Sequence, residues 1–406
     1  MENWKRNLWL LWIGCFFTSS SYSMVVPFLP LFLLQIGVHH HTEVWSGVLF
    51  SAAFLAGAVV SPIWGALSDK YGRKPMIIRA GFSLFFVYTL TAFVTNPYEL
   101  LILRILQGLL SGFIPAAITL VSSNTPNNKV GYALAMMSTA TASGNILGPL
   151  LGGGLAELLS NRLAFFSAGV LVLLSTLLVV FWVTEKSFQP SVLRASVVDD
   201  MRQSARNRPF MIILFLTVST TFSLMTIEPV LPLYIVHLMH SNENTSLLTG
   251  IIFSLPGVAS IIFAPYWGKL ADKIGFRPVL VIGLLGGGLG SIAQMPFHDI
   301  WGFSIARFIF GIFFCAVFPA INGLVVQTTP KDFRGRAFGL NQTANQVGSM
   351  LGPMVGGVIG GIFAINSVFF VTGVLLLAVT GLAYWSKGRN TTIKQGTDHE
   401  HKKMAD

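Results

Sequence analysis

The hydrophobic positions of this chain fall into long runs, separated by short segments rich in Gly, Asp, Lys and Arg. A helix that crosses a membrane needs about 20 mostly apolar residues, and twelve runs meet that length. We therefore expect an all-helical integral membrane protein with twelve transmembrane helices. The expected spans are Leu8 to Ile36, Val44 to Leu67, Met76 to Thr95, Tyr98 to Ser122, Val130 to Leu159, Leu163 to Val183, Phe210 to Met239, Leu247 to Leu270, Val279 to Pro296, Ile300 to Val326, Ala337 to Phe363 and Ser367 to Trp385.

Composition agrees with this pattern. Of the 406 residues, 53% are hydrophobic and 10% are charged, against roughly 25% charged residues in an ordinary soluble domain. The net charge of +10 does not indicate a nucleic-acid partner, because the basic residues lie in short clusters between apolar runs and form no continuous face. The first span follows Lys5 and Arg6 but far exceeds the apolar core of a signal peptide, so we expect a retained helix.

The chain contains an internal duplication. The segment SPIWGALSDKYGRKP begins at Ser61, and APYWGKLADKIGFRP begins 203 positions later at Ala264. The run GNILGPLLGG from Gly144 likewise matches GSMLGPMVGG from Gly348. Each matched element occupies the same helix number and orientation in its half, which predicts two six-helix halves related by a pseudo-two-fold axis along the membrane normal. We place the halves at residues 1–184 and 210–386, with a cytoplasmic linker at 185–209 and a disordered cytoplasmic tail at 387–406.

Basic residues predict the orientation. With both termini in the cytoplasm, 23 of the 26 Lys and Arg residues lie on the inner side, Arg162 lies outside, and Arg104 and Arg307 lie within spans. Positive residues are concentrated in cytoplasmic loops of membrane proteins. We therefore expect cytoplasmic N- and C-termini.

These motifs resemble the major facilitator superfamily, in particular its bacterial twelve-helix drug:proton antiporters, over residues 1 to 386. The resemblance implies transport by rocking of the two halves, a central cavity lined by helices 1, 4, 7 and 10, and location in the bacterial cytoplasmic (inner) membrane. It also implies no cofactor beyond the proton gradient as the energy source.

The first family motif joins helices 2 and 3 in each half. A carboxylate beside cations and a helix N-terminus can hold one conformation, which suggests a cytoplasmic gate; simple topology anchors with turn glycines are the alternative. Phe276 replaces Arg73 in the second copy, so we expect the first copy to carry more of the gating electrostatics. The motif residues are Gly65, Asp69, Gly72, Arg73 and Lys74, then Gly268, Asp272, Gly275 and Arg277.

The second motif places Arg104, Gln107 and Gly108 in helix 4, with Arg307 and Gly311 in helix 10. A guanidinium within the bilayer costs at least ~3 kcal/mol on insertion scales, so it should face protein or water. Snorkelling of Arg104 to the headgroups is the alternative. The resemblance associates the helix 4 arginine with proton transfer.

The third motif is glycine-rich. Glycines four positions apart permit close helix contact and a proline bends the helix, so we expect a tight, hinged interface between the halves; packing alone is the alternative. In the resembled family the run in helix 5 is an exporter signature. The residues are Gly144, Gly148, Pro149 and Gly152 in helix 5, and Gly348, Gly352 and Pro353 in helix 11.

Glu228 in helix 7 is the one acid that we place well inside a span. Acids within a membrane are costly and functional by default, and its depth is comparable with that of Arg104 and Arg307. We therefore expect Glu228 to carry a proton or bind a cation across one cavity with the arginines. A structural ion pair is the alternative, and the lack of an acid in helices 1 and 4 departs from many related pumps.

Large apolar side chains on helices 1 and 7 suit a polyspecific site, since aromatics and methionines repack around different ligands. They are Trp12, Phe16, Phe17, Tyr22, Met24, Phe215, Phe222 and Met225. We conclude that the chain is a monomeric, proton-coupled exporter of lipophilic or amphipathic compounds. A carrier for one anionic metabolite or siderophore is the alternative within transport. A membrane enzyme or receptor is disfavoured, because HExxH, nucleotide-loop and GxSxG motifs are absent.

Overall fold

The structure is a computed structural model, and it describes residues 3–126, 129–185, 207–239, 245–330 and 333–385. The tail expected at 387–406 lies outside the described residues, as does the linker from 186 to 206.

The first half consists of six helices, two of which are broken. Pro27 and Pro30 lie where the first helix passes through a 3₁₀ turn, because proline lacks the N–H that continues an α-helix. The elements are α1 (Asn3–Val25), η1 (Val26–Phe28), α2 (Leu29–Gln35), α3 (Thr42–Tyr71), α4 (Arg73–Thr91), α5 (Pro97–Leu110), α6 (Phe113–Asn124), α7 (Val130–Leu158) and α8 (Asn161–Trp182).

The second half repeats this order. Its elements are α10 (Arg208–Ile227), α11 (Leu231–Met239), α12 (Thr245–Ile274), α13 (Phe276–Ile292), α14 (Ile300–Phe314), α15 (Val317–Thr328), α16 (Arg334–Ile362) and α17 (Ser367–Trp385). Counting each broken helix once gives six spans per half, so the predicted twelve-helix fold is confirmed. Eight of these segments are by themselves long and apolar enough to cross a membrane, and α4, α7, α13 and α16 complete the bundle.

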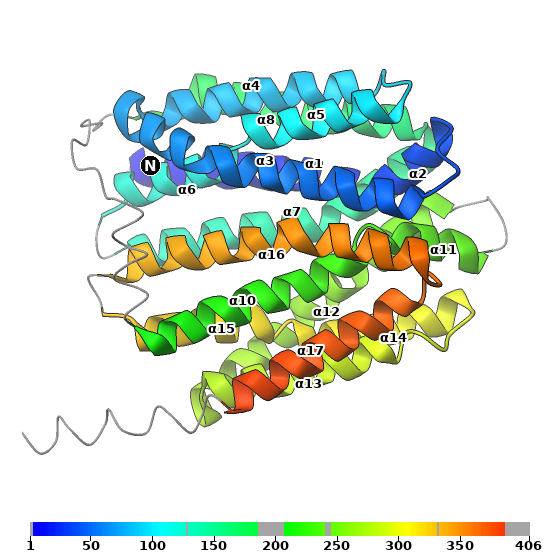
Figure 1. Cartoon of the computed structure of the whole chain (residues 1–406). Coiled ribbons are helices and arrows are strands. Elements are labelled where there is room, and N and C mark those ends of the chain that lie inside the picture. Colours follow the sequence, from blue (N-terminus) through cyan, green and yellow to red (C-terminus); the bar gives the residue numbers. More distant parts are fainter. Residues whose placement is uncertain (1–2, 127–128, 186–206, 240–244, 331–332, 386–406) are drawn as a thin grey trace, which may run out of the picture.

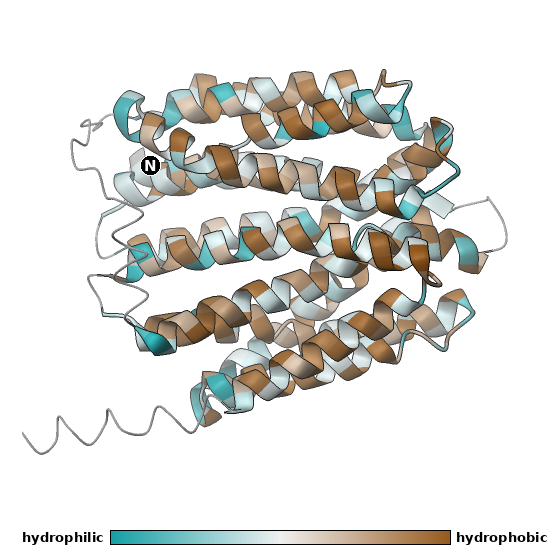
Figure 2. Cartoon of the chain, in the orientation of Figure 1, coloured by the Kyte–Doolittle hydropathy of each residue, from teal (hydrophilic) through white to brown (hydrophobic). Residues whose placement is uncertain are grey.

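The helices run side by side, and both ends of the described chain lie at the same end of the bundle (Figure 1). We call this the termini end, and the opposite end, where α2 and α11 lie, the far end. Hydrophobic residues extend along the helices, whereas hydrophilic residues gather at the two ends (Figure 2). Large apolar side chains such as Phe86, Phe181 and Ile305 are exposed on the outside. That arrangement suits a lipid environment.

Each half contains two apolar cores, one towards each end. In the first half, Phe32 and Phe165 belong to the far-end core, and Leu11 and Phe113 belong to the termini-end core. Between them α1 presents buried hydroxyl groups, of which Ser23 donates to the carbonyl of Gly144 on α7 at 2.9 Å. Ser23 thus joins α1 to α7 and has the partner that a buried hydroxyl group needs.

The two halves meet at the far end through paired contacts. A Cβ atom added at Gly47 of α3 would overlap the carbonyl oxygen of Pro353 on α16, and one added at Gly250 of α12 would overlap that of Pro149 on α7. These four positions are related by the internal repeat. Small residues let helix backbones approach this closely, so two symmetry-related contacts close the far end.

The glycine-rich motif lies partly elsewhere than expected. Gly144, Gly148 and Gly152 pack against α1 of their own half, and Gly348 and Gly352 pack against α10 of theirs. The contact between the halves instead uses Pro149 and Pro353, the last glycine of each run, Gly153 and Gly357, and glycines of α3 and α12. Glycines spaced four residues apart lie on one face of a helix. In α7 and α16 that face packs against α1 or α10, and a different face meets the other half.

We expect Gly153→Ala to destabilise the protein and Gly154→Ala to leave it nearly unchanged. A methyl group at Gly153 would lie 2.9 Å from the carbonyl oxygen of Ser246 in the other half, whereas Gly154 has open space around it. Overpacking of this kind costs about 1–3 kcal/mol. Unfolding midpoints of the two neighbouring variants in detergent provide the measurement, and equal midpoints would contradict the contact between the halves.

Candidate functional site: a cavity between the halves

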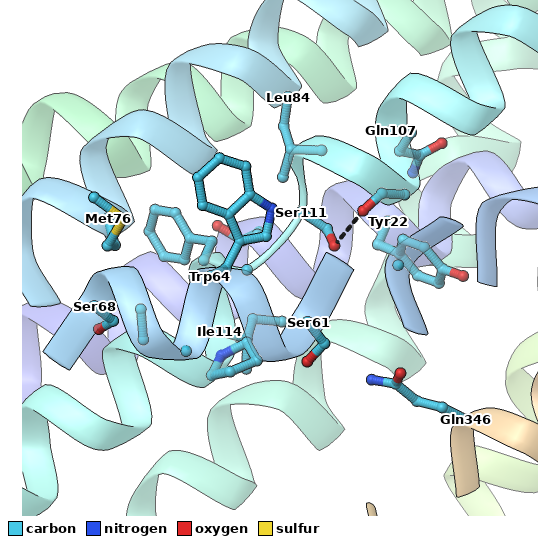
Figure 3. Close-up of a pocket in the computed structure, with 18 of the residues that line it drawn as sticks. Tyr22, Ser61, Trp64, Ser68, Met76, Leu84, Gln107, Ser111, Ile114 and Gln346 are labelled. Carbon is cyan, nitrogen blue, oxygen red and sulfur yellow. Dashed lines mark hydrogen bonds between the residues drawn. The ribbon is translucent and has the colours of Figure 1, made fainter. Parts of the chain in front are cut away.

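A cavity of about 540 Å³ extends through the middle of the bundle towards the termini end. Figure 3 shows Tyr22 and Gln107 at one end of it, and Ser68 and Met76 at the other. Asp69 lies at the termini end of the cavity, and its side chain is 53% exposed. Among the described residues, glycine contacts close the far end, and the lining of the cavity reaches the termini end at Ser68 and Asp69.

The elements that line this cavity differ from those that the family resemblance implied. Helices 1 and 4 contribute, but the other described lining residues come from α3, α4 and α16 rather than from helices 7 and 10. Of the aromatic and methionine side chains expected there, Tyr22 alone is among the described lining residues. Phe16 stacks on Trp12 with ring centroids 5.7 Å apart, and Phe215 is exposed but is not among the described lining residues. Which face of a helix turns inward depends on the packing of the bundle.

Helix 4 is broken beside the cavity. Gly112 has φ of 126°, a conformation that glycine adopts readily, and it separates α5 from α6. Carbonyl groups freed at a helix end need new partners. Trp64 Nε1 donates to the carbonyl of Leu109 at 2.7 Å, and Arg79 Nη2 donates to that of Ser111 at 2.9 Å. Trp64 of α3 and Arg79 of α4 thus supply hydrogen bonds that stabilise the break between α5 and α6.

Arg79 is a cavity residue that our sequence analysis missed. We counted it with the cytoplasmic cations, although the expected span Met76 to Thr95 contains it. Its guanidinium lies 3.3 Å from the centre of the Trp64 ring, a favourable cation–π arrangement. In the second half Trp267 donates to the carbonyl of Ile312, also at 2.7 Å, but Ile282 occupies the position of Arg79. The cation is therefore specific to the first half.

Arg104 points into the protein. Its side chain is 5% exposed, and its Nη1 donates to Gln107 Oε1 at 2.9 Å. Gln107 Nε2 in turn donates to the hydroxyl of Tyr88 at 3.0 Å. This network contradicts snorkelling towards the headgroups, and it connects the arginine to the wall of the cavity through Gln107.

Arg307 on α14 and Glu228 at the break between α10 and α11 are the intramembrane charges of the second half. Arg307 is 5% exposed, its Nη1 donates to Gln294 Oε1 at 3.5 Å, and its charge interacts with that of Glu228. Glu228 follows α10 at the break before α11. Within the described residues the two side chains form no direct salt bridge or hydrogen bond.

Tyr22 connects these charges to the cavity. Its side chain lines the inner end of the cavity and lies within electrostatic range of both Glu228 and Arg104. The structure thus brings the intramembrane charges of helices 4, 7 and 10 into one region.

The loop after α3 forms its contacts within the first half. Arg73 Nη2 lies 3.4 Å from Asp69 Oδ1, and Gly72, with φ of 98°, turns the chain into α4. Glu185, which we expected in the linker, accepts hydrogen bonds from the backbone N–H of Arg73 at 3.0 Å and of Lys74 at 2.9 Å. A carboxylate at a helix N-terminus is stabilising. No local sequence pattern predicts this contact, because Glu185 is 111 positions from Lys74 in the chain.

The second loop lacks this arrangement. Gly275, with φ of 91°, makes the same turn into α13, and Arg277 Nε donates to the carbonyl of Ala383 at 3.1 Å. Asp272 is exposed and forms no ion pair with the described residues. Gly65 and Gly268 both lie inside helices with open space around them.

Across the residues that the structure describes, no group of three His, Cys, Asp or Glu side chains is placed to hold a metal ion.

Comparisons with known proteins agree with this architecture. The family model described as Major Facilitator Superfamily matches residues 11–248 and 214–405. The chain is 36% identical over 386 residues to the multidrug resistance protein MdtG of Rahnella sp., covering 94% of each chain. It is 38% identical to MdtG of Salmonella arizonae over 379 residues, or 92% of this chain and 94% of the relative.

Solved structures share the fold at low sequence identity. The nucleoside transporter NupG aligns with a TM-score of 0.78 at 12% identity, covering 93% of this chain and 99% of NupG. The human organic anion transporter MFSD10 aligns with a TM-score of 0.69 at 16% identity, covering 94% and 100%. At such identities the likeness concerns the fold alone.

We expect Glu185→Gln to lower the stability of the first half by about 1 kcal/mol, because the variant loses the negative charge that caps α4. Asp272→Asn is the matched control, since it removes an exposed carboxylate at the same end of the bundle. Unfolding midpoints in detergent at low and high salt distinguish the two. An equal shift in both variants would contradict a specific capping role for Glu185.

Proposed function

The chain belongs to the Major Facilitator Superfamily, and we propose that it is a proton-driven exporter of lipophilic and amphipathic compounds that works by alternating access. Membership places it among transporters rather than enzymes. The observation that carries the proposal is the cavity between the halves, which is closed at one end and open at the other. The relatives named multidrug resistance protein support efflux of several compounds rather than one metabolite.

The termini end faces the cytoplasm in this proposal. Basic residues concentrate on the cytoplasmic side of membrane proteins, and the described loops and helix ends at the termini end carry Lys70, Lys74, Lys129, Lys269 and Lys273. The cavity then opens inwards, so a compound enters it from the cytoplasm of a bacterial cell or from the inner leaflet of its cytoplasmic membrane.

Export requires the far end to open and the termini end to close. At Gly47 and Gly250 the halves meet through backbone rather than through interlocked side chains, so the contact can separate without repacking a core. On closure of the termini end, Asp69 and Arg73 at the mouth of the cavity would approach the second half. Such rocking of two packed bundles about a central site is typical of repeat-built transporters.

Glu228 is the residue that we assign to proton coupling. An ionised carboxylate inside a membrane is costly unless it is paired or hydrated, and here Arg307 supplies the neighbouring positive charge. Uptake of a proton by Glu228 would release Arg307 from this interaction and change the charge around Tyr22. In this proposal the proton gradient is the energy source, and no cofactor takes part. A single chain contains the complete transport site.

We expect Glu228→Gln to reduce efflux driven by a pH gradient about tenfold or more, equivalent to ~1.4 kcal/mol or more, because glutamine cannot carry the proton. Substrate exchange without a gradient should persist. Glu99→Gln, at an exposed helix start, is the control and should transport normally. Initial rates in inverted vesicles measure both. Full gradient-driven efflux by Glu228→Gln would exclude this carboxylate as the coupling residue.

The loop after α3 should contribute more to transport than the loop after α12. Asp69→Asn should slow transport more than Asp272→Asn, because Asp69 pairs with Arg73 at the mouth of the cavity whereas Asp272 has Phe276 at the corresponding position. Rates of dye efflux at matched expression test this. Equal effects of the two substitutions would remove the asymmetry between the loops.

A further inference from the structure

One wall of the cavity is a polar stripe on α16. Gln342, Asn345, Gln346 and Ser349 all line the cavity, and their spacing of three and four places them on one face of the helix. Figure 3 shows Gln346 reaching from α16 towards the region of Ser61 and Tyr22. We call these four residues the amide stripe. The opposite wall is largely apolar and aromatic, with Phe54, Trp64 and Leu84 among its residues.

The amides of this stripe are available for a ligand. Neither Gln342 nor Gln346 forms a side-chain hydrogen bond with any residue that the structure describes. Asn345 Oδ1 accepts from the hydroxyl of Thr221 at 2.8 Å, which orients its Nδ2 donor but leaves that donor unused. Asn341, which does not line the cavity, bonds both Thr217 and Asn322. The cavity-facing amides therefore keep hydrogen-bonding capacity that the fold does not use.

Acidic and basic side chains are distributed unevenly around the cavity. Within its described lining only Asp69 and Arg79 carry a formal charge. Asp69 lies at the mouth beside Arg73, whereas Arg79 lies deeper, with Nε and Nη1 unbonded in the described structure. Arg104 stands behind Gln107 at the inner end. Glu228 interacts with Arg307 and is not among the described lining residues. The charge that the described lining places away from the mouth is therefore positive.

We propose that the amide stripe and Arg79 select neutral or anionic amphiphiles that carry several hydrogen-bonding oxygens, and that they disfavour permanent cations. The apolar body of such a compound packs against the aromatic wall, while its oxygens accept hydrogen bonds from Gln342, Asn345 and Gln346. A cation would meet Arg79, and the only acid among the described lining residues is Asp69 at the mouth. This inference rests on the proposed function and names the substrate class of the same site.

The amide stripe has one competing role, as a contact that forms when the termini end closes and α16 approaches α3. In that role a substitution would slow transport of every compound equally and leave binding unchanged. In the role that we propose, it changes binding and does so differently for different head groups. Equilibrium binding to the purified protein therefore separates the two roles.

The experiment compares three probes that share one fluorophore and one octyl chain but end in a disaccharide, a carboxylate or a trimethylammonium group. Fluorescence anisotropy gives their half-saturating concentrations for the full chain in lipid nanodiscs. For the wild type we expect the disaccharide and carboxylate probes to bind at least about tenfold more tightly than the ammonium probe. Comparable binding of the ammonium probe would overturn the proposal.

Two sets of variants locate the selectivity. Gln342→Leu combined with Gln346→Leu should weaken disaccharide binding about tenfold and affect the ammonium probe least. Thr343→Val is the matched control, because Thr343 lies on the same helix outside the cavity and bonds only the carbonyl of Gly339. Arg79→Gln should weaken the carboxylate probe and strengthen the ammonium probe, whereas Arg79→Lys should keep the wild-type order.

Equal weakening of all three probes by the Gln342 and Gln346 substitutions would contradict selection by the stripe, and unchanged binding with slower transport would assign the stripe to closure instead. Arg79 also stabilises the break in helix 4, so Arg79→Gln could fail to fold. In that case Arg79→Lys and the comparison of the three probes on the wild type still test the selectivity. Binding is measured without a proton gradient. Ordered binding without gradient-driven efflux would therefore contradict the proposed coupling and leave the proposed selectivity standing.

Discussion

The close approach of backbones at the far end is the contact on which the rest of the structure depends. Gly47 meets the carbonyl of Pro353, and Gly250 meets that of Pro149, so the two halves touch where a side chain would separate them. Because the halves converge there, they diverge towards the termini end and leave the cavity between them.

Polar and charged side chains occupy the space that this geometry creates. Arg104 and Arg79 both find hydrogen-bond partners inside the bundle, which lowers the cost of placing charge within a membrane. Arg104 reaches the cavity through Gln107, and Arg79 holds the broken helix 4 while lying against Trp64. Electrostatics and architecture are thus coupled: the side chains that stabilise the irregular backbone also set the potential that a ligand meets.

Much of the fold could be predicted from the sequence, and less of the site. Twelve apolar runs and a repeat at a constant offset suffice for two six-helix halves, because the bilayer sets the helix length and duplication sets the symmetry. The intramembrane charges Arg104, Arg307 and Glu228 were identifiable for the same reason, since charge inside a span is rare. The sequence did not predict the roles of Arg79, Glu185 and the amide stripe. Those roles depend on contacts between helices that are distant in sequence, or on the direction in which one helix face turns.

The sequence alone determined the number of helices, their pairing into halves and the presence of buried charge, because each depends on local composition measured against a fixed membrane thickness. The tertiary structure decided which glycines join the halves, which end is closed and which side chains line the cavity. Those properties depend on the rotation of each helix about its own axis and on the tilt of one half against the other. Neither angle is encoded in any single segment, since both result from packing of all the segments together.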